Sequence, residues 1–197
     1  MYEKILLTLL ILVLSSAAAF AQTKVQNKFL GLEMGQPYKA IFECPELMET
    51  ASNNYNWSPL KDVPARCIQI PSVSFGGRYW NYMEYSFSPS GIFYKFRVYS
   101  DYDSPKDAEP RYTSLMSDLD LKYLGKSGIT REEDDSFNPK SGDSERSVTY
   151  RDGQGMECRL VLEYSQSTNN GMTYFLMLYY IDTKLEAAAK AEFVKEL

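Results

Sequence analysis

The sequence predicts an α+β fold, an antiparallel sheet of about six strands with two to three helices. Strand-like runs follow one another closely in two parts of the chain, residues 66–100 and 147–181. Glycine, asparagine and proline separate neighbouring runs, which favours short turns and antiparallel pairing. The helical patterns lie apart from these runs, as is typical of the α+β class.

The segment Phe75–Ser100, FGGRYWNYMEYSFSPSGIFYKFRVYS, is predicted to form a β-hairpin. Ser88-Pro89-Ser90-Gly91 supplies the turn, because proline presets φ and glycine tolerates positive φ. This turn sets the register of the two strands and gives them one largely apolar face, which we expect to be the core face. Its cross-strand pairs are Phe87 with Ile92, Tyr85 with Tyr94, Met83 with Phe96, and Asn81 with Val98.

The opposite face of this hairpin mixes aromatic and charged side chains. The same register pairs Ser86 with Phe93, Glu84 with Lys95, Tyr82 with Arg97, and Trp80 with Tyr99. Aromatic residues and arginine are enriched at the centres of protein interfaces, and aromatic ring faces also suit a glycan. The candidate ligand-binding residues are therefore Trp80, Tyr82, Phe93, Arg97 and Tyr99. The alternative is that a helix covers this face and makes its aromatic residues part of the core.

The first 21 residues are typical of a secretory signal peptide. Lys4 precedes the apolar run Ile5–Leu14, and Ala19-Phe20-Ala21 matches the A-x-A cleavage pattern. The apolar run is shorter than the roughly 20 residues that span a bilayer, which disfavours a permanent anchor. We expect a periplasmic or secreted protein, residues 22–197, with no stable membrane anchor after cleavage.

Composition and charge narrow the class of protein. The chain is 44% hydrophobic and 24% charged, which is typical of a globular protein. Residues 22–197 suit one domain, with two candidate halves at 29–101 and 102–182 followed by a C-terminal helix at 183–197. The formal net charge of −5 and the lack of a basic tract argue against a nucleic-acid partner.

Three cysteines, Cys44, Cys67 and Cys158, would face an oxidising compartment. Cys44 and Cys67 flank a polar, asparagine-rich segment, which makes them candidates for a disulfide bond that closes this loop. Such a bond would stabilise the fold by roughly 3 kcal/mol. A Cys67–Cys158 bond is the alternative, because connectivity cannot be read from spacing.

Shorter elements are expected before the hairpin and a longer helix after it. Pro37 suits the first turn of a helix that Pro45 limits to about two turns. Residues 46–65 are expected to form a loop, with one helical turn at Glu46–Ala51 as the alternative for its start, followed by a strand at 66–75. Ser104 resembles the start of a capping box, although Pro110 allows the helix to begin later. Apolar residues then keep helical spacing up to Gly125: Tyr112, Leu115, Met116, Leu119 and Tyr123.

The last third of the chain predicts a loop, three strands and a helix. Residues 125–146 are polar and predict a long loop, whose acidic run lacks the spacing of a calcium-binding EF-hand. Ser147–Arg151 and Met156–Ser165 follow as strands, the second with alternate residues buried. Met172–Ile181 is apolar on both faces, which predicts a central strand covered on each side. Thr183 is the expected cap of the final helix.

The element order is compatible with two tandem α-β-β-β halves. The stretch FLGLEMGQPYKAIF resembles the short helix starts of small exported domains related to β-lactamase inhibitor protein and to outer-membrane assembly lipoproteins of Gram-negative bacteria. The chain is also similar to exported proteins of Bacteroidetes-type bacteria. The resemblance implies tandem helix–sheet units, a concave sheet face rich in aromatic residues, and binding rather than catalysis.

What the chain lacks excludes several kinds of catalysis. It has no histidine, which removes Ser-His-Asp and Cys-His catalysis and histidine-based zinc sites. No glycine motif for phosphate occurs, so we expect no cofactor, metal or catalytic residue. A glycosidase needs two carboxylates about 5–9 Å apart, and Glu84, Glu157 and Glu163 are the ordered candidates.

These features together predict an exported, non-enzymatic binding or interaction module whose partner is a protein or a glycan. Two alternatives stay open, a periplasmic carbohydrate-active accessory protein or hydrolase, and a purely structural component of the envelope. The sequence does not tell whether the mixed hairpin face is exposed or lies under a helix.

Overall fold

A computed structural model describes residues 24–52, 66–138, 144–166 and 172–195. The expected signal peptide and most of the asparagine-rich segment lie outside these ranges. Within them, no helix is both long enough and apolar enough to cross a membrane.

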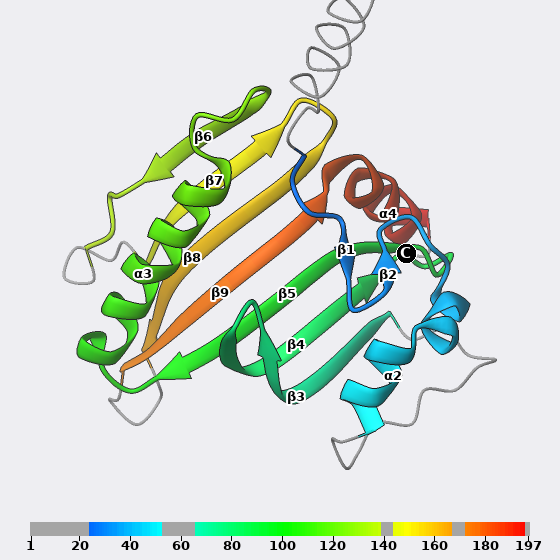
Figure 1. The fold of residues 1–197 in the computed structure, drawn as a ribbon, viewed down its shortest axis with the longest axis horizontal. Helices are drawn as coiled ribbons and strands as arrows, with labels where there is room; N and C mark the ends of the chain where they lie inside the picture. The colour runs from blue at the N-terminus through cyan, green and yellow to red at the C-terminus, as the bar shows by residue number, and fades with distance from the viewer. Residues whose placement is uncertain (1–23, 53–65, 139–143, 167–171, 196–197) are drawn as a thin grey trace, which may run out of the picture.

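The fold is α+β, as predicted, and is built on one antiparallel sheet of seven strands in the order β3-β4-β5-β9-β8-β7-β6 (Figure 1). The strands are β3 (Cys67–Phe75), β4 (Arg78–Phe87), β5 (Phe93–Tyr102), β6 (Ile129–Asp134), β7 (Glu145–Asp152), β8 (Met156–Gln166) and β9 (Met172–Asp182). A separate two-stranded hairpin, β1 (Lys28–Phe29) and β2 (Leu32–Glu33), precedes them.

Two runs of consecutive antiparallel strands meet at the centre of this sheet. Strands β3 to β5 form one run and β6 to β9 the other, and β5 pairs with β9 where they join. The 3-10 helix η1 (Tyr38–Glu43) and α2 (Pro45–Ser52) precede the first run, and α3 (Pro105–Tyr123) precedes the second. The helix α4 (Thr183–Lys195) follows β9.

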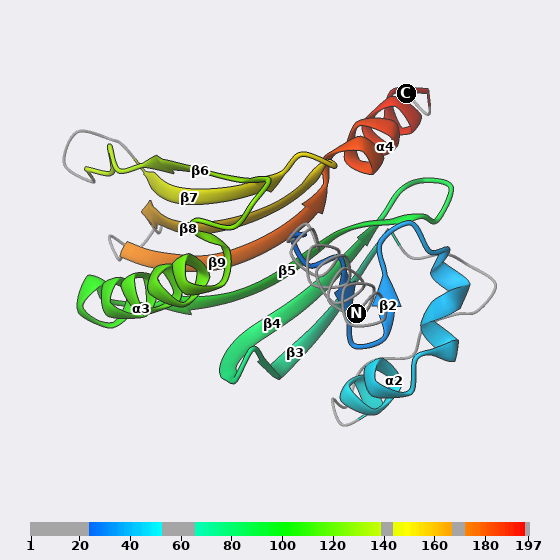
Figure 2. The same cartoon turned by 45° about the horizontal axis from the view of Figure 1, so that its top comes forward.

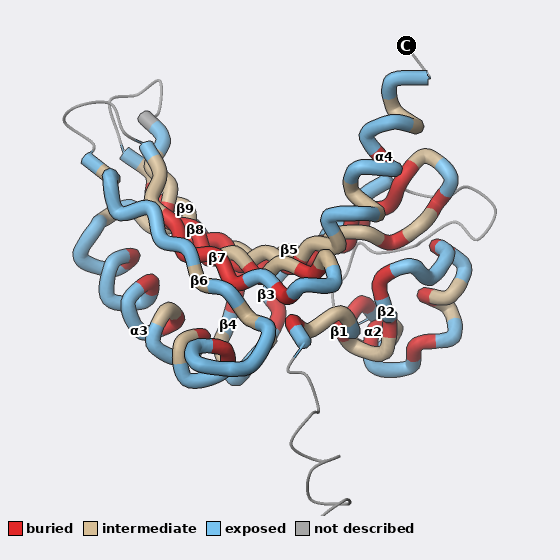
Figure 3. Tube along the Cα trace, turned by 90° about the horizontal axis from the view of Figure 1, so that it is seen from above, coloured by how far each residue is buried: buried red, intermediate tan, exposed pale blue. Residues whose placement is uncertain are grey.

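The sheet is curved, and its two faces are covered differently. Helix α3 and the β1–β2 hairpin lie on the convex side, whereas α4 rises on the other side at one end (Figures 2 and 3). Apolar residues of α3 are buried against the convex face: Ala108, Tyr112, Leu115, Leu119 and Tyr123. Phe29 of β1 stacks on Phe96 of β5, with ring centroids 4.1 Å apart. We call the opposite side of the sheet the concave face.

Helix α3 starts at its capping serine and not at the later proline. The side chain of Ser104 accepts a hydrogen bond from the backbone N–H of Lys106, at 3.1 Å. Pro105 occupies the first helical turn, where a missing N–H removes no intrahelical bond. The helix continues past Pro110 to Tyr123, and Gly125 follows with a positive φ of 73°.

Part of the predicted loop at 125–146 is a strand. Residues Ile129–Asp134 form β6, which pairs with β7 at the edge of the sheet. Its side chains are mostly exposed, so alternation of apolar and polar residues is missing from the sequence. Arg131 instead holds β6 against α3, because its Nε donates a hydrogen bond to Asp120 of that helix at 2.9 Å.

The three cysteines are all described, and all three are free. Cys44 is buried against the convex face, close to Gly31. Cys67 is exposed and opposite Ser86, and its surroundings are Glu84, Lys95 and Arg97 on the other face. The predicted Cys44–Cys67 disulfide is therefore wrong in this structure, because the sheet separates the two side chains. Cys158 is buried and does not pair either.

Candidate functional site

The concave face is the side of the sheet that no described helix covers along its length (Figure 3). Alternate residues of each strand point to it, and the register aligns them in rows across neighbouring strands. One row runs through Gln69 of β3, Glu84 of β4, Arg97 of β5, Tyr179 of β9 and Arg159 of β8. The face therefore draws its side chains from both runs of strands.

A group of aromatic and charged residues stands at the centre of this face, and we call it the concave cluster: Tyr82, Glu84, Arg97, Tyr99 and Tyr179. The rings of Tyr82 and Tyr99 stack with centroids 4.9 Å apart and planes 24° apart. The Arg97 guanidinium lies 4.7 Å from the Tyr99 ring centre and 5.8 Å from that of Tyr179. Cation–π contacts of this kind are worth about 0.5–2 kcal/mol each.

Arg97 is held in place by charge as well as by stacking. Its Nη2 donates to the Glu84 carboxylate at 2.5 Å, and only 11% of the Glu84 side chain is exposed. Partial burial by itself lowers the pKa of Arg97, but hydrogen bonding to Tyr179 and the charge of Glu84 outweigh it, so the pKa is raised. The Nε atom of Arg97 is buried and has no hydrogen-bond partner. Arg97 is therefore a positively charged side chain held in one position, and its Nε–H group is a hydrogen-bond donor without an acceptor.

The thiol of Cys67, which borders this site, does not have the properties of a nucleophile. Cys67 lies near Glu84, and although its surface is partly exposed, desolvation by its neighbours together with the Glu84 charge raises its pKa to about 11. A cysteine nucleophile works as the thiolate, and an activated one has a lowered pKa. Cys67 is therefore protonated at neutral pH.

An apolar stripe continues the concave cluster along β9. Phe175, Met177, Tyr179 and Ile181 alternate with core residues and point to the concave face, next to Val161 of β8. Met177 is only 7% exposed and Val161 only 2%, while their larger neighbours are half-buried. The part of the face beside the concave cluster is therefore apolar and closely packed.

Ion pairs border this stripe on the side of β7 and β8. Arg159 pairs with Glu145, and Arg151 pairs with Glu157 at 2.8 Å and with Glu132. These side chains are part of the same face, and each arginine is paired with at least one glutamate. An apolar centre with a polar border is the usual plan of a protein-binding surface.

Three of the five predicted ligand-binding residues lie in the concave cluster and two do not. Tyr82, Arg97 and Tyr99 lie there, half-buried. Trp80 is 2% exposed beside α3, and its indole N–H donates to the Phe75 carbonyl at 3.1 Å. Phe93 is fully buried, with its ring 5.3 Å from that of Tyr85. The prediction that Trp80 and Phe93 share the binding face is wrong.

The predicted register of the hairpin is also shifted. Tyr82 pairs with Tyr99 and Glu84 with Arg97, so the predicted Glu84–Lys95 pair does not form. The register changes between Ser86 and Phe87, where Phe87 faces Phe93. A shift of two residues keeps each side chain on its face, which is why most of the predicted faces survive.

Strand β9 contributes residues that the sequence did not single out. It was expected to be central and covered on both sides; it is central, but the concave side has no helix along its length (Figure 3). Tyr179 and Met177 therefore belong to the candidate surface. In the sequence, the sign of these residues is that both faces of Met172–Ile181 are apolar. The same pattern is expected for a strand buried on both sides and for a strand whose outer face binds a partner.

The three candidate carboxylates do not meet. Strands β5 and β9 separate Glu84 on β4 from Glu157 and Glu163 on β8. Three strand spacings of about 4.8 Å place these backbones roughly 14 Å apart, beyond the carboxylate pairs of glycosidases. Glu84 and Glu157 are each bound to an arginine. Among the residues that the structure describes, no group of three or more acidic, cysteine or histidine side chains is placed to hold a metal ion.

Comparisons with known proteins add no information about this site. Neither the family models, nor the curated proteins, nor the solved structures compared with this chain gave a match.

Proposed function

We propose that this chain is an exported, non-enzymatic binding module that docks a protein partner on its concave face. The proposal is supported chiefly by the concave cluster, an aromatic and arginine group at the centre of an uncovered sheet face. Tyrosine and arginine dominate the binding energy of protein interfaces when they stand in such central positions.

The cluster is also ordered before any partner arrives. Tyr99 stacks on Tyr82, and Arg97 is fixed by Glu84, so these side chains have little rotamer freedom to lose on binding. Immobilising a flexible side chain at an interface opposes binding by about 0.5–1.5 kcal/mol. Preorganisation of this kind favours a recognition surface.

The geometry favours a protein over a glycan. A sugar ring stacks on the open face of an aromatic side chain, but the Tyr99 ring is already stacked on Tyr82 and contacted by Arg97. The Tyr99 hydroxyl already accepts from Gln69 and the Tyr179 hydroxyl donates to the Met177 sulfur, so the cluster offers chiefly ring edges and the apolar stripe of β9. These groups suit the side chains and backbone of a polypeptide.

The decisive experiment compares partner capture by three forms of the protein from periplasmic and culture-supernatant fractions. The double variant Tyr99→Ala/Tyr179→Ala removes two rings of the cluster, and Tyr79→Ala removes an exposed tyrosine elsewhere. We expect at least one protein to bind the parent chain and Tyr79→Ala and to be lost by the double variant. Its Kd, measured with the purified partner, should rise about 30-fold or more on loss of two central residues.

Circular dichroism and thermal unfolding establish that the double variant is folded. A partner whose affinity is the same for the parent and the double variant would rule out the concave face as its docking site. Binding to a glycan array that depends on Tyr99 would replace the protein partner with a carbohydrate one. Hydrolysis of a glycan that Glu84→Gln abolishes would overturn the non-enzymatic assignment.

A further inference from the structure

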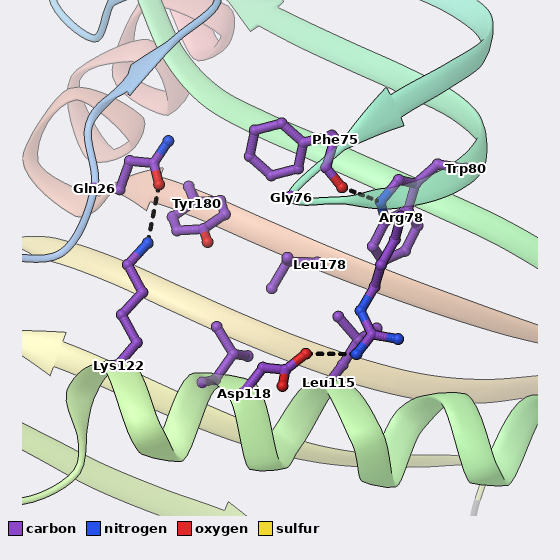
Figure 4. A pocket seen from close by; sticks show the side chains of 11 residues that line it. Gln26, Phe75, Gly76, Arg78, Trp80, Leu115, Asp118, Lys122, Leu178 and Tyr180 are labelled. Atoms are coloured by element: carbon purple, nitrogen blue, oxygen red, sulfur yellow. Dashed lines mark hydrogen bonds and ion pairs between the residues drawn. The ribbon is translucent and has the colours of Figure 1, made fainter.

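A cavity separate from the concave face lies on the convex side, between α3 and the turn that joins β3 to β4 (Figure 4). Its volume is about 150 Å³. Cavities of about this size in apolar surroundings take up a single benzene ring. It is partly open to solvent, and it shares no residue with the concave cluster.

The floor of this cavity is apolar and largely aromatic. It is lined by Phe75, Trp80, Leu115, Leu119, Leu178 and Tyr180. Trp80 and Leu178 are buried, and the Trp80 N–H is already satisfied by the Phe75 carbonyl, so the floor presents no free donor from this indole. A flat apolar ring fits such a floor.

The rim carries two cations and one carboxylate, and only one of the cations has its charge balanced. Arg78 donates to Asp118 at 2.5 Å and to Ser114 at 2.8 Å. At the other end, Lys122 donates to the neutral amide of Gln26 at 3.0 Å (Figure 4). No carboxylate among the described residues pairs with Lys122. Burial around its ammonium lowers the pKa of Lys122, and a bound anion would offset that effect.

We infer that this cavity binds a monocyclic aromatic carboxylate, with the ring on the floor and the carboxylate at Lys122. The single unbalanced ammonium matches one negative charge. Asp118 on the same rim opposes a doubly charged group such as a phosphate monoester. The ligand is small because the cavity has room for little more than one ring.

The test uses three probes on the purified chain: phenylacetate, the neutral phenylacetamide, and acetate. Binding is followed by the indole N–H signal of Trp80 in ¹H–¹⁵N NMR spectra, with Trp57→Phe to assign it between the two tryptophans. We expect phenylacetate to bind more tightly than phenylacetamide and to shift the Trp80 signal. Acetate should leave that signal unchanged, because it has no ring for the floor.

Two lysine variants test whether the charge of Lys122 contributes to the binding of phenylacetate. Lys122→Met keeps the length of the side chain and removes the ammonium, and Lys126→Met changes an exposed lysine that does not line the cavity. We expect Lys122→Met to weaken phenylacetate binding about tenfold and to leave phenylacetamide within about twofold. Lys126→Met should bind both probes as the parent does.

Three results would each overturn the inference. The first is no shift of the Trp80 signal with phenylacetate or benzoate at tens of millimolar. The second is equal affinity for phenylacetate and phenylacetamide. The third is equal weakening by the two lysine variants. Lys122 and Lys126 both have exposed side chains, and thermal unfolding of each variant checks that it is folded.

Discussion

Tyr99 is the residue that connects the parts of the concave cluster. It stacks on Tyr82, lies against the Arg97 guanidinium, and accepts a hydrogen bond from the Gln69 amide. Each contact alone is worth about 1 kcal/mol. Together they fix three neighbouring side chains on an open face, which is where the binding proposal starts.

Two aromatic residues on β4, two positions apart, lie on different faces because the strand is irregular between them. Ser72 on the neighbouring strand has a positive φ of 55°. Opposite it, the N–H of Asn81 bonds to the Ser100 hydroxyl at 3.1 Å. The period-two rule holds only along a regular strand, so it fails between Trp80 and Tyr82.

The same pair gives a prediction about stability. Trp80→Ala should lower the free energy of unfolding by about 3–5 kcal/mol, because it empties a buried site against α3. Tyr82→Ala should lower it by about 0.5–1.5 kcal/mol, the value of its stacking on Tyr99. Urea unfolding of both variants checks the difference. Equal losses would mean that Tyr82 is as buried as Trp80 and is unavailable to a partner.

At the scale of elements, the ends of helices are set by side chains that the sequence only partly indicates. Helix α3 begins at Ser104, as the capping box predicts. Helix α4 is different, because Thr183 is its first residue and bonds outward to the Gly155 carbonyl at 2.9 Å. The carboxylate of Asp182 accepts from the N–H groups of Lys184 and Leu185 instead, both at 3.0 Å. The expected Thr183 cap is therefore wrong by one residue.

This difference predicts that Asp182 and Thr183 contribute unequally to the stability of the protein. Asp182→Ala should destabilise the protein by about 0.5–2 kcal/mol, because it leaves two helix N–H groups without their acceptor. Thr183→Val should have a smaller effect, since it removes one exposed hydrogen bond. Hydrogen exchange of the α4 amides and urea unfolding measure both changes. A larger loss for Thr183→Val would assign the capping role to the threonine.

Strand β6 shows why an edge element is hard to read from sequence. Its exposed residues carry no apolar period, and its order comes from pairing with β7 and from the Arg131–Asp120 contact with α3. Tyr150 of β7 donates to the same carboxylate at 2.6 Å. All these partners are distant in sequence, so no local pattern contains them.

At the scale of the whole molecule, the ionisable groups of the core set the response to pH. Burial raises the pKa of Tyr112 and of Cys158 to about 12. Burial also raises the pKa values of Tyr85, Tyr123 and Tyr180 well above the usual range. The chain has no histidine to titrate between pH 6 and 8.

The free energy of unfolding should therefore be nearly constant from pH 6 to 8 and fall at alkaline pH. The unfolded chain loses protons from its cysteines near pH 9 and from its tyrosines near pH 10, whereas the folded chain retains them. Stability is thus complete below these values and is lost as pH rises through them. Each such tyrosine contributes a slope of up to about 1.4 kcal/mol per pH unit.

Urea unfolding at pH 7, 10 and 11 measures this slope. Tyr112→Phe should make it shallower, and Tyr79→Phe serves as the control because that side chain is 59% exposed in the folded protein. An unchanged slope for Tyr112→Phe would show that this tyrosine ionises equally in both states.

The sequence by itself determined the α+β class, most of the strands and helices, and the core side of most strands. Each of these follows from short-range patterns: apolar period, turn residues and capping residues. Only the tertiary structure decided that the sheet has one covered and one open face. It also decided that Trp80 and Phe93 are core residues, that Tyr179 joins Tyr82, Arg97 and Tyr99, and that Cys44 and Cys67 lie apart. These outcomes depend on strand irregularities and on contacts between residues far apart in the chain, which no local pattern records.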